Sequence, residues 1–399
     1  MIHSIRIPRS EFDERKAVLL NYVRERHLRG AVIFDSTNIL YYSGFAFIPT
    51  ERPIIYVLSA SGEQAMFVPR LELEHVKAET GVDRVGHYRE YPGVPRPEVA
   101  FKEMLGEMKM LGGEGEIGAD MDGYPWILGY EGPRLSELTD LTFVNIHQFI
   151  YRQQWIKSAH ELALIRESCK WGHLAHVLLQ RYTRPGATET AVSLRASNEA
   201  TLAMMDTIGP IYRAQGWGGG PSAGYRGQIG RNAAIPHALA NNIVFQPGDV
   251  LVTGAGCLMW GYHSELERTM FIGEPTAEQQ ALFNHMKNAQ EIAFEAMKPG
   301  VKCSEVDDAV RAYYEKNKLT AHWKHHSGHA IGLRYHEGPY LDSGDDTVLR
   351  PGMVFTVEPG FYSAELGGYR HSDTVAITAD GIEQMTYYPR DLEPLIIPV

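Results

Sequence analysis

The sequence predicts a two-domain protein in which an α/β N-terminal domain precedes an α+β C-terminal domain. The chain has 399 residues, well above the size of a typical single domain. Short β-branched runs alternate with helical patterns in its first part, and the pattern changes near residue 155. We therefore place the domains at residues 1–154 and 155–399.

The N-terminal domain shows the alternation expected of an α/β fold. Residues 11–29 carry apolar side chains near helical spacing. Residues 30–35 and 52–58 are short β-branched runs bounded by turn residues, which is typical of strands.

The C-terminal domain begins at a capping box, because Ser158 and Glu161 have the spacing that starts a helix. Helices are expected at about residues 158–183, 187–205, 276–297 and 303–318. Strand segments within 249–272 and 324–378 contain many Gly and Pro residues and predict mainly antiparallel pairing. The Gly-rich residues 216–224 lack the ending of a phosphate-binding loop, so we expect a mobile pocket wall or a plain surface loop.

The amino-acid composition and net charge indicate which classes of ligand the protein binds. Hydrophobic residues make up 44% of the chain, and the net charge of −11 comes without any basic run. This argues against nucleic acid or an anionic membrane and favours a small or peptide-like ligand. The N-terminus has no signal-peptide core, no segment reaches membrane-spanning length, and the three cysteines are scattered. We expect a reduced, cytoplasmic protein.

Ionisable side chains interrupt the apolar strand segments. A buried ionisable group is costly unless it is paired or used, so these residues are candidates for a functional site. Glu265 and Glu267 are two residues apart and share one strand face, whereas Arg268 points to the other face, so Glu267 needs another cationic partner. The full set is His237, Glu265, Glu267, His329, His336, Glu358 and residues 371–373.

These motifs, in this order, resemble the pita-bread family that includes creatinase, aminopeptidase P, prolidase and methionine aminopeptidase. The resemblance extends over nearly the whole chain, from the N-terminal domain through the helix start at residues 156–166 to the strand motifs that end at Thr378. It implies a pita-bread C-terminal domain with a creatinase-type α/β N-terminal domain. It also implies a homodimer in which the partner's N-terminal domain completes the active site.

The metallopeptidases of this family hold two metal ions through two Asp, one His and two Glu. At the matching positions this chain has Gly254 and Glu265 in place of the two Asp, His329 and Glu358 retained, and Ser372 in place of the last Glu. A dinuclear site bridged by carboxylates is not expected from this set. The leading hypothesis therefore includes no cofactor.

The pattern of lost ligands is similar to creatinase, which hydrolyses a C–N bond without metal. The resemblance implies that His237 is the general acid/base, that Glu267 and Glu358 hold a cationic substrate, and that His329 hydrogen-bonds it. The substrate would be a small amidine-, guanidine- or lactam-like compound carrying a carboxylate, oriented by Arg52 of the partner subunit. Further substrate-binding candidates are Trp217, Tyr262, Glu265, His336 and His371.

Two alternatives stay open. The first is an Xaa-Pro peptidase or lyase with a single divalent metal held by Glu265, His329 and Glu358, helped by His371 or Asp373. The second is a non-catalytic family member that binds a ligand or a partner protein. Metal content and the effect of a chelator on activity distinguish them.

Overall fold

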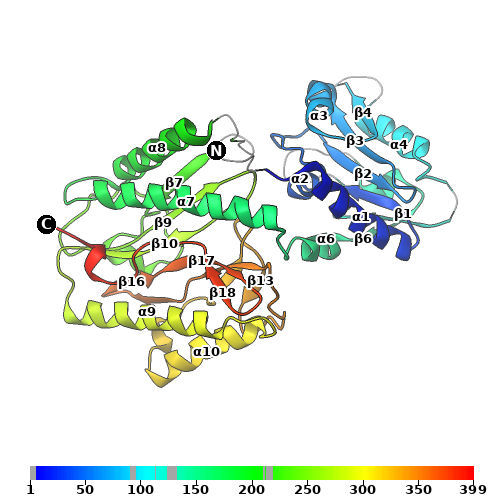
Figure 1. Ribbon diagram of the computed structural model, residues 1–399. Coiled ribbons are helices and arrows are strands. Elements are labelled where there is room, and N and C mark those ends of the chain that lie inside the picture. Colours follow the sequence, from blue (N-terminus) through cyan, green and yellow to red (C-terminus); the bar gives the residue numbers. More distant parts are fainter. Residues whose placement is uncertain (1–5, 90–95, 113, 124–132, 210–211, 213–218) are drawn as a thin grey trace. The chain divides into compact units, whose positions relative to one another are not determined.

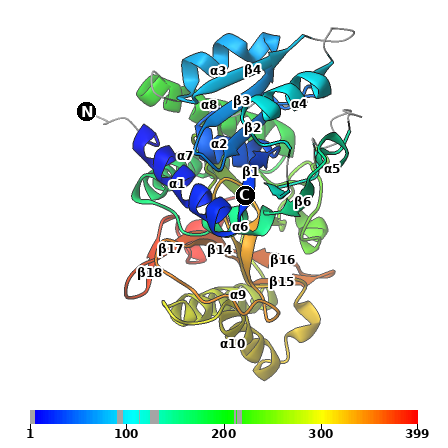
Figure 2. The ribbon, with the colours of Figure 1, turned by 90° about the vertical axis from the view of Figure 1, so that its right-hand side faces the viewer.

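The computed structural model describes residues 6–89, 96–112, 114–123, 133–209, 212 and 219–399. The chain divides into two compact units (Figures 1 and 2). The N-terminal unit is built from Ile7–Gln154, and the C-terminal unit chiefly from Trp155–Ala214 and Gly218–Val399.

The N-terminal unit contains a mixed six-stranded sheet in the order β4-β3-β2-β1-β5-β6. Its strands are β1 (Leu28–Ile33), β2 (Ile55–Ser59), β3 (Gln64–Pro69), β4 (Arg84–Tyr88), β5 (Glu116–Ala119) and β6 (Thr142–Asn145). Its α-helices are α1 (Arg9–Glu25), α2 (Ser36–Ser43), α3 (Leu73–Glu79), α4 (Pro97–Glu107), α5 (Leu135–Leu138) and α6 (His147–Gln153). The helix predicted at residues 11–29 ends at Glu25, because β1 already begins at Leu28.

The C-terminal unit is built on an antiparallel eight-stranded sheet. Its strand order is β13-β12-β14-β17-β10-β9-β7, with β18 paired to β17. These strands are β7 (Gly220–Gly224), β9 (Gly254–Leu258), β10 (Leu266–Glu267), β12 (Gly328–Ala330), β13 (Glu337–Leu341), β14 (Val354–Val357), β17 (Ser372–Ile377) and β18 (Ile382–Gln384). Smaller sheets contain β8 (Val250–Val252), β11 (Thr269–Ile272), β15 (Gly360–Ser363), β16 (Gly367–Arg370) and β19 (Ile396–Ile397).

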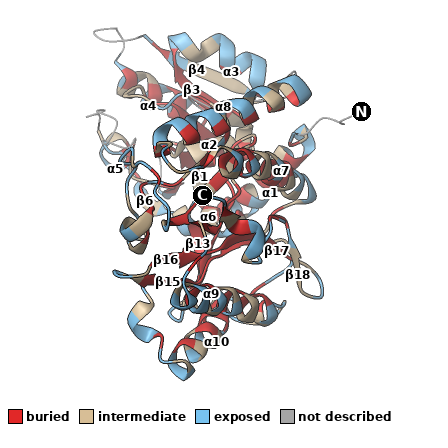
Figure 3. Ribbon diagram, turned by 90° about the vertical axis from the view of Figure 1, so that its left-hand side faces the viewer, coloured by how far each residue is buried: buried red, intermediate tan, exposed pale blue. Residues whose placement is uncertain are grey.

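Long helices cover this sheet in pairs. They are α7 (Ala159–Tyr182), α8 (Glu189–Ile208), α9 (Ala277–Ala296) and α10 (Cys303–Lys316). α7 and α8 pack on β7 and β9, whereas α9 contacts β14 and β16 and pairs with α10 (Figure 1). Figure 3 shows the buried strands between helices whose outer faces are exposed.

Local sequence explains how α7 is placed. The predicted capping box is present, because Ser158 Oγ accepts a hydrogen bond from Glu161 N at 3.1 Å and Glu161 Oε2 accepts one from Ser158 N at 2.8 Å. Farther along α7, a Cβ built on Gly172 would lie only 3.0 Å from the Cα of Gly256 on β9. A glycine at this position therefore allows the helix to approach the sheet closely.

The predicted alternation in the N-terminal unit and the predicted antiparallel α+β arrangement in the C-terminal unit are both confirmed. The prediction that residues 216–224 form a loop is wrong in part, because Gly220–Gly224 forms β7 and pairs with β9. Residues 216–218 lie outside the described residues. Within the described ranges, no helix combines the length and the apolar character needed to cross a membrane.

Candidate active site

Strand pairing in the C-terminal unit gathers side chains that lie far apart in the sequence. β10 pairs with β17, so that Glu267 lies opposite Ser372, and β14 and β12 continue the sheet beyond β17. Glu265 directly precedes β10, His329 lies on β12, and Glu358 directly follows β14. The sheet therefore concentrates carboxylates and one imidazole, all buried, in one region.

His329 and Glu358 form an ion pair, with 3.3 Å between Nε2 and Oε1. His329 Nδ1 lies 2.9 Å from the carbonyl oxygen of Ala330, which can only accept, so Nδ1 carries a hydrogen. Burial by itself lowers the pKa of His329, but Glu358 and then Glu265 outweigh it and raise this pKa to about 9. Burial likewise opposes ionisation of Glu358, yet His329 and Arg370 hold its pKa well below the usual range.

Glu265 lies beside this pair, and its ionisation is disfavoured. Burial, followed by the charges of Glu358 and Glu267, raises the pKa of Glu265 to about 7. The hydroxyl of Ser372 donates to Glu265 Oε1 at 2.6 Å. The backbone is fixed as well, because Thr374 Oγ1 lies 2.9 Å from Glu265 N and 2.8 Å from its carbonyl oxygen.

Glu267 is held by two arginines of the same chain. Arg370 donates to both carboxylate oxygens, from Nη2 to Oε1 at 2.8 Å and from Nε to Oε2. Arg226 Nη2 donates to Oε1 at 3.1 Å. Arg370 is thus the cationic partner that Glu267 required, in place of the substrate cation that the sequence analysis expected. The sequence could have indicated this partner, because Arg370 lies two residues before Ser372 and an extended chain directs both side chains to the same side.

His336 and His237 lie near the buried cluster but are exposed themselves. The rings of His336 and His329 stack with centroids 3.8 Å apart and an interplanar angle of 20°. Burial, followed by the charge of His329, lowers the pKa of His336 to about 4. His237 also contributes to this lowering, which makes it a neighbour of His336. His336 is therefore a neutral imidazole at pH 7.

Two of the predicted site residues, His371 and Asp373, point away from the candidate site. Arg370 and Ser372 point to the site, so the intervening His371 and the following Asp373 point away from it. The His371 ring packs against Phe283 with centroids 5.2 Å apart, and it is fully buried. Asp373 pairs with Arg268 at 2.8 Å, with both side chains 0% exposed. The expected substrate-binding role of His371 and the helper roles of His371 and Asp373 at a metal are therefore wrong.

The remaining candidates have structural or untested positions. Tyr262 is buried and donates its hydroxyl to Glu161 Oε1 at 2.7 Å, so it supports the start of α7 instead of lining a pocket. Trp217 lies outside the described residues. Arg52 belongs to the N-terminal unit and pairs with Glu51 at 2.8 Å, and its contribution to a partner's site stays a prediction.

The donor set fits one divalent cation. Ligand atoms of Glu265, His329 and His336 lie within 4.8 Å of one another, and the same holds for Glu265, Glu267 and Glu358. His329 Nε2 is buried and is directed at the carboxylate of Glu358, so both groups present their ligand atoms to the same place. Gly254 offers no side-chain donor, so these residues do not supply the carboxylate bridges of a dinuclear site.

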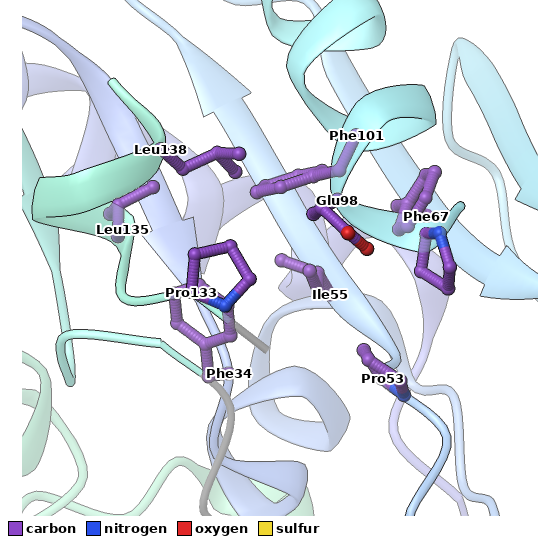
Figure 4. Close-up of a pocket in the computed structure, with 10 residues that line it drawn as sticks. Phe34, Pro53, Ile55, Phe67, Glu98, Phe101, Pro133, Leu135 and Leu138 are labelled. Atoms are coloured by element: carbon purple, nitrogen blue, oxygen red, sulfur yellow. The ribbon is translucent and has the colours of Figure 1, made fainter. Parts of the chain in front are cut away.

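A separate pocket in the N-terminal unit does not carry this chemistry. It lies between the sheet, α4 and α5 (Figure 4). Its lining is apolar except for Glu98, which pairs with Arg96 at 2.8 Å. The clustered carboxylates and histidines, and not this pocket, are therefore the candidate active site.

Comparisons with known proteins agree over the whole chain. Residues 163–379 match the model of metallopeptidase family M24, and residues 15–153 match the Creatinase/Prolidase N-terminal domain. An Xaa-Pro dipeptidase from Pyrococcus horikoshii is 27% identical over 387 residues, which cover 95% of this chain and 99% of the relative. The probable dipeptidase PepE of Mycobacterium tuberculosis is 28% identical over 389 residues, 97% of each chain.

Solved structures show the same architecture. Dipeptidase PepE from Mycobacterium ulcerans superposes with a TM-score of 0.81 at 26% identity, over 99% of this chain and 100% of that one. The prolidase from Pyrococcus horikoshii superposes with a TM-score of 0.79 at 24% identity, over 95% and 99%. The predicted pita-bread fold with a creatinase-type N-terminal domain is confirmed.

The prediction of a hydrolase is confirmed, but the prediction of a metal-independent, creatinase-like enzyme without cofactor is contradicted. The matching family is one of metallopeptidases, and the relatives are named as dipeptidases. The missing ligands at positions 254 and 372 led to the metal-free leading hypothesis, whereas the alternative kept a single metal on Glu265, His329 and Glu358. In the structure Glu265, His329 and Glu358 remain clustered, so those losses do not remove every ligand.

Proposed function

This chain belongs to metallopeptidase family M24, and from this premise we propose that it is a metal-dependent peptidase that hydrolyses Xaa-Pro dipeptides with one divalent cation. The observation that carries the proposal is that Glu265 lies at ligand spacing both from His329 and from Glu358, which are themselves 3.3 Å apart. The preference for proline rests on the relatives named as Xaa-Pro dipeptidases.

Glu265, His329 and Glu358 would hold the cation, which supplies Lewis acidity at the scissile carbonyl when it is bound. Glu358 is ready to act as a ligand, because His329 and Arg370 keep its pKa low and its carboxylate ionised. His329 must give up its proton to act as a ligand, so binding of the cation releases a proton.

Hydrolysis adds the hydroxyl of one water to the carbonyl carbon, breaks the C–N bond and delivers a proton to the departing proline nitrogen. Glu265 would give up its own proton on binding the cation, because burial and its acidic neighbours raise its pKa to about 7 in the absence of that charge. The neutral imidazole of exposed His336 lies over His329 and is placed to hydrogen-bond the substrate. His237, its neighbour, is the second histidine proposed to contact substrate.

The test combines metal content with turnover. Protein prepared without a metal-binding tag should carry about one divalent metal per subunit, and it should cleave an Xaa-Pro dipeptide faster than the matched Xaa-Ala dipeptide. A chelator should abolish cleavage, and Mn²⁺, Co²⁺ or Zn²⁺ should restore it. Glu358→Gln should lose both metal and activity, whereas the surface variant Glu383→Gln should keep both. Protein without stoichiometric metal that leaves the dipeptide uncut would overturn the proposal.

A further inference from the structure

A buried ion pair lies next to the segment that carries His336. Lys157 Nζ and Glu337 Oε1 are 2.5 Å apart, and each side chain is only 1% exposed. Glu337 begins β13 and directly follows His336. Neither Lys157 nor Glu337 has a part in the proposed reaction.

The segment between β12 and β13 is attached to its surroundings at several points. Its backbone is joined to its surroundings by Ile331 N, which donates to Val354 O at 3.1 Å, and by Gly332 O, which accepts from His263 N at 2.8 Å. Glu337 Oε2 accepts from the backbone nitrogen of Arg334 at 3.3 Å. One carboxylate thus connects Lys157 to the backbone of the segment that presents His336.

The segment also passes directly over the ion pair. A Cβ built on Gly332 would meet Lys157 Cε at 2.7 Å and Glu337 Oε1 at 2.9 Å. Only a glycine leaves room for the backbone at this distance from the pair. The ion pair therefore limits how closely the backbone of the segment can approach it.

Lys157 itself is held in place independently of Glu337. Its backbone nitrogen donates to Gly352 O at 2.8 Å, and the next residue, Ser158, caps α7. Lys157 is thus anchored through its own backbone and not only through Glu337.

Contacts between aromatic rings connect this segment to the candidate active site. The ring of Tyr335 lies 5.5 Å from that of His336, and it meets His263 edge-on at 5.7 Å. His336 in turn stacks on His329 at 3.8 Å. A shift of the backbone beside Glu337 would therefore change the His336–His329 stack.

A buried ion pair is seldom the most stable way to fill its space, because the cost of desolvating both charges offsets their attraction. It does fix geometry, since breaking it leaves an uncompensated buried charge. We propose that Lys157 and Glu337 are positioning residues that hold His336 in its stack on His329. The effect on catalysis rests on the proposed function, whereas the effect on the position of His336 does not.

The test is the double variant Lys157→Met/Glu337→Leu, which removes both charges and keeps apolar volume. The position of His336 is followed by NMR with isotope-labelled histidine, with its resonance assigned from His336→Gln. We expect that resonance to lose the ring-current shift of the stack and to move towards that of a free imidazole. With an Xaa-Pro dipeptide, kcat should fall about tenfold while KM changes less than about twofold.

Lys170→Met is the matched control, because Lys170 pairs with Glu167 on the surface of α7 and its side chain is 58% exposed. It should leave both the resonance and kcat unchanged. Glu337→Asp is the milder variant for the case in which the double variant does not fold. It keeps the charge pair but withdraws the carboxylate by one methylene, and a partial shift of His336 is expected.

An unchanged His336 resonance in the folded double variant, or in Glu337→Asp if the double variant does not fold, would overturn the positioning role. If the resonance shifts but the wild-type protein cleaves no dipeptide, the proposed function fails and the positioning role stands. The two proposals are therefore separable.

Discussion

Gly254 and Glu267 face each other across the paired strands β9 and β10, and a Cβ built on Gly254 would lie 3.5 Å from Glu267 Oε1. Position 254 thus lacks the carboxylate of the family pattern, and Glu267 on the neighbouring strand places another carboxylate close to it. Glu267 does not act as a free ligand there, because Arg370 and Arg226 both donate to it. Glu267 thus compensates in position for the carboxylate missing at residue 254, while the two arginines neutralise its charge.

The first prediction follows from this exchange. The triple variant Gly254→Asp/Glu267→Thr/Ser372→Glu restores the family's donor positions and removes the carboxylate that crowds them. Its metal content should rise from about one to about two divalent ions per subunit, measured by elemental analysis after dialysis. The three single variants serve as controls and should stay at about one. A triple variant that folds but gains no metal would refute the compensation.

The second prediction concerns the Glu267–Arg370 pair, in which both side chains are 3% exposed. Arg370→Met or Glu267→Gln should lower the free energy of unfolding of the C-terminal unit by about 3–5 kcal/mol, because each removes the main charge partner of a buried group. The double variant should cost less than the sum of the two. Urea unfolding in a double-mutant cycle measures this coupling.

Arg166→Met is the matched control for that cycle. Arg166 pairs with Glu383 at 2.7 Å, but the two side chains are 42% and 36% exposed. Removing this pair should cost less than about 1 kcal/mol. Equal costs at the two arginines would contradict the role given to burial.

The third prediction concerns pH. Burial, and then the charge of Arg268, holds the pKa of His176 and of His371 well below the ordinary value. Below pH 6.5 the unfolded chain takes up protons at these histidines while the folded chain does not, so stability is lost as the pH falls. Each histidine contributes up to about 1.4 kcal/mol per pH unit.

The unfolding midpoint between pH 8 and pH 5 measures this loss. His371→Phe should make the decline less steep, because the unfolded chain then has one proton site fewer. His87→Gln, at an exposed position of β4, should leave the slope unchanged. A slope that His371→Phe does not alter would contradict the assignment.

The fourth prediction separates a structural role from a substrate-binding role for Tyr262. Its hydroxyl donates to Glu161, whose other oxygen completes the capping box of α7. Tyr262→Phe should therefore cost about 1 kcal/mol of stability, seen in thermal unfolding, while kcat and KM stay unchanged. A large rise in KM would instead place this hydroxyl on the substrate.

The fifth prediction tests the homodimer and Arg52. If Arg52 acts in the partner's site, Arg52→Ala and Glu358→Gln should each be inactive alone. Subunits mixed after mild dissociation should regain about a quarter of wild-type activity, because half of the molecules are mixed dimers with one intact site of two. Light scattering checks the dimer. Recovery absent in proven mixed dimers would remove Arg52 from the site.

The sequence by itself determined the alternation of helices and strands, the capping box that starts α7, and several of the buried ionisable residues, among them Glu265, Glu267, His329 and Glu358. These depend on local periodicity, on capping chemistry and on the cost of burying charge, all of which can be seen along the chain. It also indicated that Glu267 needs a cation, because Arg268 must point the other way.

Only the tertiary structure decided which residues meet. Arg370 became the partner of Glu267, and His371 and Asp373 were turned away from the site, because a strand alternates its faces and the register of β10 with β17 selects which face is inward. Lys157 and Glu337 are 180 positions apart, and no local pattern pairs them. Register and long-range packing are properties of the folded chain, and they decided the site.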